Sequence, residues 1–182
     1  MQRLGDSIDR YSTARSLILA IIVAAVSVSV MGYLTQTLVY DVYGEANMPD
    51  TNLSYTYEQI MEAFGTLGPE GLLMWLQVHL LDLIFPLGYG FAMAIGIALL
   101  AKRAFPGRIE LRTLALIPLL GAIADYIENG LIATQILAYP AVSQLVVAVA
   151  SVVTTLKWGL IYLGFVVILV LVLVVIWMRV RG

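Results

Sequence analysis

The sequence predicts an all-α integral membrane protein, in which residues 1–182 form one domain built on a bundle of four transmembrane helices. Composition is the first observation: 61% of the residues are hydrophobic and 12% are charged, whereas soluble domains have about 45–50% and about 25%. The second is that four apolar stretches exceed the roughly 20 residues needed to cross a bilayer core. A water-soluble enzyme, a disordered chain and a nucleic-acid-binding protein are therefore excluded. With no cysteine, disulfide and thiol chemistry are excluded too.

Prolines mark where the predicted helices begin and end. The apolar run of the first helix is longer than that of a secretory signal peptide, so we interpret it as a retained helix. Pro69 suits the first turn of the second helix, and Pro106 separates the second helix from the third. Pro140 separates the third helix from the fourth. The predicted helices cover about residues 16–39, 69–103, 109–138 and 140–178.

The cations predict how the helices are oriented. Of the ten Lys and Arg residues, all but Lys157 fall on one side of the four-helix arrangement. Cytoplasmic segments of membrane proteins are enriched in Lys and Arg. We therefore expect a multi-pass protein of the plasma (inner) membrane, with both termini and the turn near Pro106 in the cytoplasm. The cations used are Arg3, Arg10, Arg15, Lys102, Arg103, Arg108, Arg112, Arg179 and Arg181.

The loop over residues 40–70, expected outside the cell, contains the signature of a short amphipathic helix. Thr56 and Gln59 have the spacing of a capping box, and apolar residues then recur at helical intervals up to Phe64. We expect this helix to lie on the outer membrane surface or to cap the bundle. The carboxylates that make this face acidic are Asp41, Glu45, Asp50, Glu58, Glu62 and Glu70.

Three carboxylates, one lysine, one histidine and one asparagine lie well inside the predicted spans, where an ionisable group costs about 2.5–3.5 kcal/mol on insertion scales. Measured from the helix midpoints, the three carboxylates and the lysine fall within one layer about 4.5 Å deep, in the outer half of the membrane. Because such groups normally face the interior of a bundle, we expect them to form one site. They are His79 and Asp82 on the second helix, Asp125, Glu128 and Asn129 on the third, and Lys157 on the fourth.

Local spacing supports this site. His79 and Asp82 are three residues apart and share one face of the second helix, which Tyr89 continues. Pro86 cannot donate a hydrogen bond to the carbonyl of Asp82, which predicts a kink at that carboxylate. The fourth helix carries small residues at intervals of seven around its lysine, which let a neighbouring helix approach closely: Ser143, Ala150 and Gly164.

The charges of the layer favour a binding site. Three carboxylates and one ammonium leave a surplus of negative charge, so either a carboxyl is protonated or a cation lies among them. The main hypothesis is a site, open to the outside, that binds or conducts a proton, a cation or a small cationic ligand. Its candidate residues are His79, Asp82, Tyr89, Asp125, Glu128, Asn129 and Lys157.

Three alternatives stay open. In an intramembrane enzyme acting on a lipid-like substrate, the carboxyls and His79 would be acid and base, and Lys157 or Asn129 would stabilise developing charge. In an accessory subunit of a larger membrane complex, small residues would receive partner helices. In a purely structural interpretation, Asp82 or Asp125 pairs with Lys157 and holds the helices in register.

The sequence says little about cofactors and partners. With a single histidine and no cysteine we expect no metal site, and the sequence identifies no cofactor. The expected partners are the lipid bilayer and, beyond it, either further copies of the chain or a larger membrane complex. No nucleic acid is expected.

Overall fold

The computed structural model describes residues 2–49 and 52–181, and within them it is all-helical, with 87% helix and no strand. Four helical stretches of the described chain are long and apolar enough to cross a membrane. The predicted number of long helices is confirmed. The four stretches are Ala14–Tyr43, Tyr57–Ala104, Ile109–Ala138 and Gln144–Arg181.

The first long stretch begins two residues before its predicted start and continues past its predicted end. A capping box between Thr13 and Ser16 starts α2 (Ala14–Leu34). The helix then widens into the π-helix η1 (Thr35–Tyr40) and ends in α3 (Asp41–Tyr43). Wider turns of this kind recur at functional sites of other proteins.

The capping box predicted in the 40–70 loop is confirmed. Thr56 caps α4 (Tyr57–Val78), and its backbone N–H donates to the side chain of Gln59. The predicted amphipathic helix forms the first half of α4, and its Phe64 is fully buried. Gly68, with φ of 64°, breaks the helix between this half and the predicted second helix.

The kink predicted at Asp82 is also confirmed. Between α4 and α5 (Phe85–Ala104) the backbone tightens into the 3₁₀-helix η3 (His79–Leu83). Pro86 stands in the first turn of α5, where its missing N–H costs nothing. With the break at Gly68, the second long stretch is therefore four helical pieces in series: the two halves of α4, then η3, then α5.

The third long stretch has its predicted limits, but the fourth does not. The 3₁₀-helix η4 (Ile109–Ala115) leads into α6 (Leu116–Ala138). The last helix, α7 (Gln144–Arg181), was expected to begin at residue 140, and this prediction was wrong. The backbone N–H of Ser143 donates to Gln135 Oε1 at 2.8 Å, so the preceding residues form a turn tied to α6.

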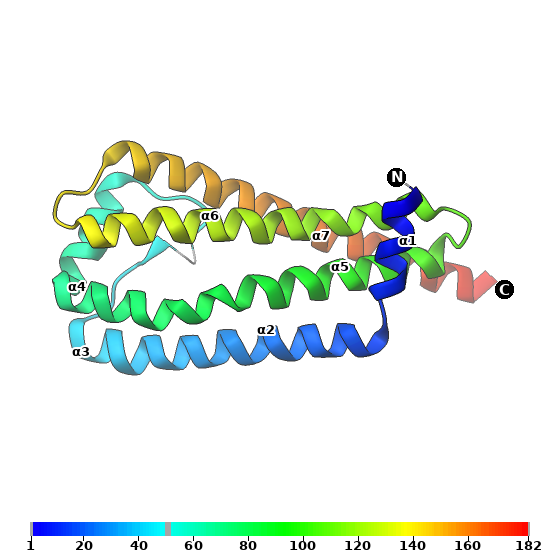
Figure 1. Cartoon of the computed structure of the whole chain (residues 1–182), viewed down its shortest axis with the longest axis horizontal. Helices are drawn as coiled ribbons and strands as arrows, with labels where there is room; N and C mark the ends of the chain where they lie inside the picture. Colours follow the sequence, from blue (N-terminus) through cyan, green and yellow to red (C-terminus); the bar gives the residue numbers. More distant parts are fainter. Residues whose placement is uncertain (1, 50–51, 182) are drawn as a thin grey trace.

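The N-terminal segment, expected only as a cationic flank, forms the helix α1 (Gln2–Tyr11). It crosses the bundle at a steep angle (Figure 1). Asp9 of α1 forms ion pairs with Lys102 Nζ at 3.3 Å and with Arg112 Nε at 3.4 Å, which hold α1 against the bundle. The intervals of four and three residues between Leu4, Ile8 and Tyr11 are the signal that could have predicted it.

The two ends of the bundle differ in which segments they contain. Figure 1 shows α1, the turn between α5 and α6 and the last turns of α7 at one end, which we call the terminal end. The start of α4 and the turn between α6 and α7 lie at the other end, which we call the loop end. We expected both ends of the chain to lie on the same side as the residue 104–108 turn, and in the structure α1 and the last turns of α7 lie at the same end of the bundle as this turn. Asp50 and the side chain of Arg3 lie outside the described residues.

Each end has its own core. At the loop end the first half of α4 packs over α6 and α7, so the amphipathic helix caps the bundle. At the terminal end small side chains, such as Ala98 and Ala101, let α5 lie close to its neighbours. Small residues also bring the helices together between the ends: a Cβ at Gly88 would lie 2.6 Å from the Ala24 nitrogen, and one at Gly164 2.8 Å from Met93 Cε.

Candidate functional site

Lys157 lies between two carboxylates in the interior of the bundle. Its Nζ is 2.6 Å from Glu128 Oε2 and 3.3 Å from Asp125 Oδ1. The exposed fractions of the three residues are 2%, 1% and 4% respectively. Helix α7 brings the lysine and α6 brings both acids, which lie one turn apart on the face predicted from their spacing.

The other predicted residues extend this ion pair into a network. Asn129 Nδ2 donates to Asp82 Oδ2, and it lies 3.5 Å from Asp125 Oδ1. The hydroxyl of Tyr89 donates to Asp125 Oδ2 at 2.9 Å. Asp125 is therefore the carboxylate at which α5, α6 and α7 meet. The structure brings all the predicted carboxylates, the amide, the tyrosine and the lysine into one network.

His79 lies at the edge of this network. Its ring stacks on Trp75, with 3.5 Å between ring centroids, and its Nδ1 is 2.9 Å from the Trp75 carbonyl oxygen. The carbonyl can only accept, so Nδ1 carries the proton in this contact. His79 and Asp82 were expected to share one face of the second helix. The tighter turns of η3 separate them instead: His79 lines a cavity, and Asp82 accepts a hydrogen bond from Asn129.

That cavity has a volume of about 580 Å³ and reaches the ion pair. Asp125 and Lys157 form part of its wall, together with His79 and Tyr89. Glu128 and Asp82 complete the network behind them. The other lining residues are Val28, Met31, Gly32, Thr35, Gln36, Tyr40, Met48, Trp75, Phe85, Met93, Trp158, Ile161 and Phe165.

Sequence reasoning missed the contribution of the first long stretch to this cavity. Thr35, Gln36 and Tyr40 of η1 line it, opposite α7. Their signal in the sequence was a cluster of polar residues at the end of a predicted span. Trp158 was also missed, because residues next to each other in a helix are turned about 100° apart, which suggests a different face from that of Lys157.

The cavity opens between α2 and α7, which both pack against α5. Its deep wall is buried, as at Met31 and Thr35 on the first long stretch and at Lys157 on α7. Its rim is exposed: Val28 of α2 is 41% exposed and Phe165 of α7 is 56% exposed. The opening therefore faces sideways from the bundle, between apolar side chains.

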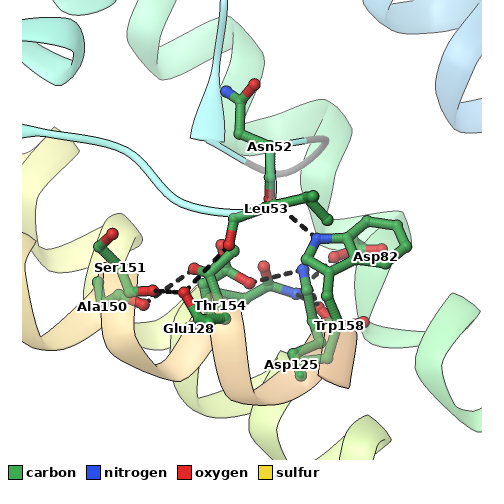
Figure 2. A network of polar contacts seen from close by, with 12 residues as sticks. Asn52, Leu53, Asp82, Asp125, Glu128, Ala150, Ser151, Thr154 and Trp158 are labelled. Carbon is green, nitrogen blue, oxygen red and sulfur yellow. Dashed lines mark hydrogen bonds and ion pairs between the residues drawn. The ribbon is translucent and has the colours of Figure 1, made fainter. Parts of the chain in front are cut away.

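A strap of residues 52–55 covers the loop end of the site. Trp158 Nε1 donates to the Asn52 carbonyl at 2.9 Å, and Thr155 Oγ1 donates to the Leu53 carbonyl at 3.1 Å. The backbone N–H of Tyr55 donates to Ser151 Oγ at 3.0 Å. Figure 2 shows Asn52 and Leu53 above α7, with Asp125 and Glu128 below them. The strap thus fixes the turn of α7 that carries Lys157.

The arrangement can hold one additional positive charge or exchange a proton. Two carboxylates contact the ammonium and a third, Asp82, joins them through Asn129, so only protonation or a cation balances the remaining negative charge. Within residues 2–49 and 52–181 no group of three or more His, Cys, Asp or Glu side chains could hold a metal ion.

The network around Asp125 is the main candidate for a functional site in this chain. Its fold is helical and its polar groups converge from three helices on one cavity. Comparison with family models, with curated proteins and with solved structures gave no match to this chain.

Proposed function

We propose that this chain is a plasma-membrane protein whose intramembrane site binds a proton or a cation, with both termini in the cytoplasm. The single observation that carries the proposal is that Asp125 and Lys157 of a buried, carboxylate-rich network line a cavity of about 580 Å³. A network that served only to hold helices in register would need no adjoining cavity.

Charge supports a cationic ligand over an anionic one. Lys157 is already in contact with Asp125 and Glu128, so its ammonium is committed to two internal partners. An anion entering the cavity would meet the surplus of carboxylates, whereas a cation would meet Asp125. Because charges interact more strongly in a site with little water, this surplus decides which sign is bound.

The position of the network supports access from the outer half of the membrane. The strap of residues 52–55 and the first half of α4 lie at the loop end, opposite the cationic terminal end. Cations flank the cytoplasmic ends of membrane helices. The loop end therefore faces outward in this proposal.

Thermal unfolding of the purified protein in detergent tests the proposal. The melting temperature is measured from pH 5 to pH 8 and with Na⁺, K⁺, Ca²⁺ and methylammonium. A ligand at a hundred times its Kd stabilises the native state by about 2.7 kcal/mol, which is a rise of about 5–10 °C for a chain of this size. We expect one of these conditions to produce such a rise.

Three variants show where the ligand binds. Asp125→Asn and Glu128→Gln should lose at least half of the rise, because each removes a charge of the network. Glu110→Gln, whose carboxylate is 46% exposed and far along the chain from the site, should keep it. If no condition stabilises the wild type, the proposal is wrong. Native purification in search of a partner complex would then test the accessory-subunit alternative.

A further inference from the structure

We propose that the ligand is an amphiphilic organic monocation, an alkylammonium whose head group lies at Asp125 and whose tail extends between α2 and α7 into the bilayer. This inference rests on the proposed function, because the same carboxylate receives the cation. It adds the chemical class of the ligand and its route of entry.

The size of the cavity favours an organic ligand over a small ion alone. A volume of about 580 Å³ falls in the range of about 300–1,000 Å³ typical of sites for organic molecules. A bare ion at Asp125 would leave an apolar space filled by water. An organic ligand replaces that water with van der Waals contacts along the wall.

Aromatic rings make the wall suitable for an organic ammonium. An ammonium group is attracted to the face of an aromatic ring within about 6 Å. Trp158 already shows this contact, since Lys157 Nζ lies 5.6 Å from its ring centroid. The aromatic side chains of the wall are Tyr40, Trp75, Phe85, Tyr89, Trp158 and Phe165.

The charges in direct contact set the charge of the head group. Asp125, Glu128 and Lys157 together carry one negative charge when all three are ionised. One positive charge balances this trio, and Asp82, held by Asn129 behind the cavity wall, does not line the cavity that receives the head group. Asp125 is the member of this trio that both lines the cavity and carries the negative sign.

The mouth of the cavity indicates where the tail lies. The exposed side chains of Val28 and Phe165 flank it, and Gly32 stands between apolar neighbours on α2. In a spanning bundle these residues face acyl chains. A ligand with an apolar tail can therefore enter sideways from the bilayer without passing the strap of residues 52–55.

Quenching of tryptophan fluorescence in lipid nanodiscs tests this inference. The protein carries Trp177→Phe, since Trp75 and Trp158 line the cavity and Trp177 is exposed on the last turns of α7. The probe is 4,5-dibromododecyl-trimethylammonium, whose bromines lie close to the head group, titrated by its mole fraction in the membrane. Its neutral and anionic counterparts are 4,5-dibromododecanol and 4,5-dibromododecyl sulfate. We expect saturable quenching by the ammonium, and only linear, non-saturating quenching by the other two.

Two glycine variants test the mouth. An added Cβ has no neighbouring atom within 4 Å at either Gly32 or Gly159, so at both positions a side chain starts in open space. Gly32→Phe narrows the mouth and should weaken the Kd of the ammonium at least tenfold, which corresponds to about 1.4 kcal/mol. Gly159→Phe, on the exposed face of α7, should leave this Kd unchanged.

Contrary outcomes separate this inference from the proposed function. Equal saturation by the alcohol or the sulfate, or an unchanged Kd in Gly32→Phe, would overturn the alkylammonium ligand. If methylammonium or an inorganic cation still raised the melting temperature through Asp125, the cation site itself would stand. If neither the probe nor any small cation or proton had an effect, both proposals would fail.

Discussion

Two buried cations, Lys157 near the loop end and Arg112 at the terminal end, have partners of different kinds. Each is 2% exposed. Arg112 donates to the backbone carbonyls of Phe105 at 3.1 Å and Pro106 at 3.3 Å, and also to that of Arg108. Its guanidinium therefore closes the turn between α5 and α6, and its Nε holds α1 through a carboxylate.

Lys157 instead contacts two carboxylates, both of which can change their protonation, and it lines a cavity. Carbonyl groups cannot release or take up a proton, so the partners of Arg112 in the turn are fixed. The comparison teaches that burial of a cation does not by itself indicate function. Our proposal rests instead on a surplus of titratable partners beside a cavity.

The largest effect is expected from Arg112→Met. Removing one partner of a buried charged network typically costs about 3–5 kcal/mol, and here three backbone carbonyls lose their donor. The free energy of unfolding in detergent should fall by that amount. Arg108→Met, whose side chain is 71% exposed, should change it by less than about 1 kcal/mol. A loss of cation binding in a folded Arg112→Met protein would contradict the purely structural role that we assign to Arg112.

Lys157→Met should lower the free energy of unfolding by a smaller amount, about 2–3 kcal/mol, because a bound proton can partly neutralise the remaining carboxylates. The double variant with Glu128→Gln should recover at least half of the loss, since it removes the closest carboxylate. The same measurement of unfolding free energy checks both proteins. Rescue that is equally large with Glu110→Gln would show that the pair is not specifically coupled.

A smaller effect is expected at the break in α4. Gly68→Ala places a side chain at φ of 64°, which costs about 1–2 kcal/mol. Gly65→Ala is the matched control, because it is helical and has no atom within 4 Å of the added Cβ. It should stabilise the protein by about 0.5–1 kcal/mol. Opposite signs in thermal unfolding would confirm that the break is built into the backbone.

The smallest effects are expected from the two capping boxes, one near each end. Thr13→Ala and Thr56→Ala should each lower the unfolding free energy by about 0.5–1 kcal/mol. Only Thr56 directly follows the strap of residues 52–55 that covers the loop end of the proposed cation site. Thr56→Ala should therefore also weaken cation binding, measured as the rise in melting temperature. An equal weakening by Thr13→Ala would argue against a role of the strap.

Much of the fold could be predicted because its signals are local. The capping box at Thr56 and the kink before Pro86 depend on residues within four positions of each other along the chain. Helix α1 escaped prediction because ten residues give only three apolar positions. The start of α7 at Gln144 escaped because the turn before it is held by Gln135 of another helix.

The sequence by itself determined the four long helices and the common depth of the carboxylates and Lys157, because rise per residue sets height along a helix. It left open whether Asp82 or Asp125 meets the lysine. Only the tertiary structure decided this: the rotation of each helix about its axis is set by packing, which turned Asp125 and Glu128 of α6 toward α7. The cavity and its side opening arise for the same reason, since they depend on where α2 and α7 lie against α5.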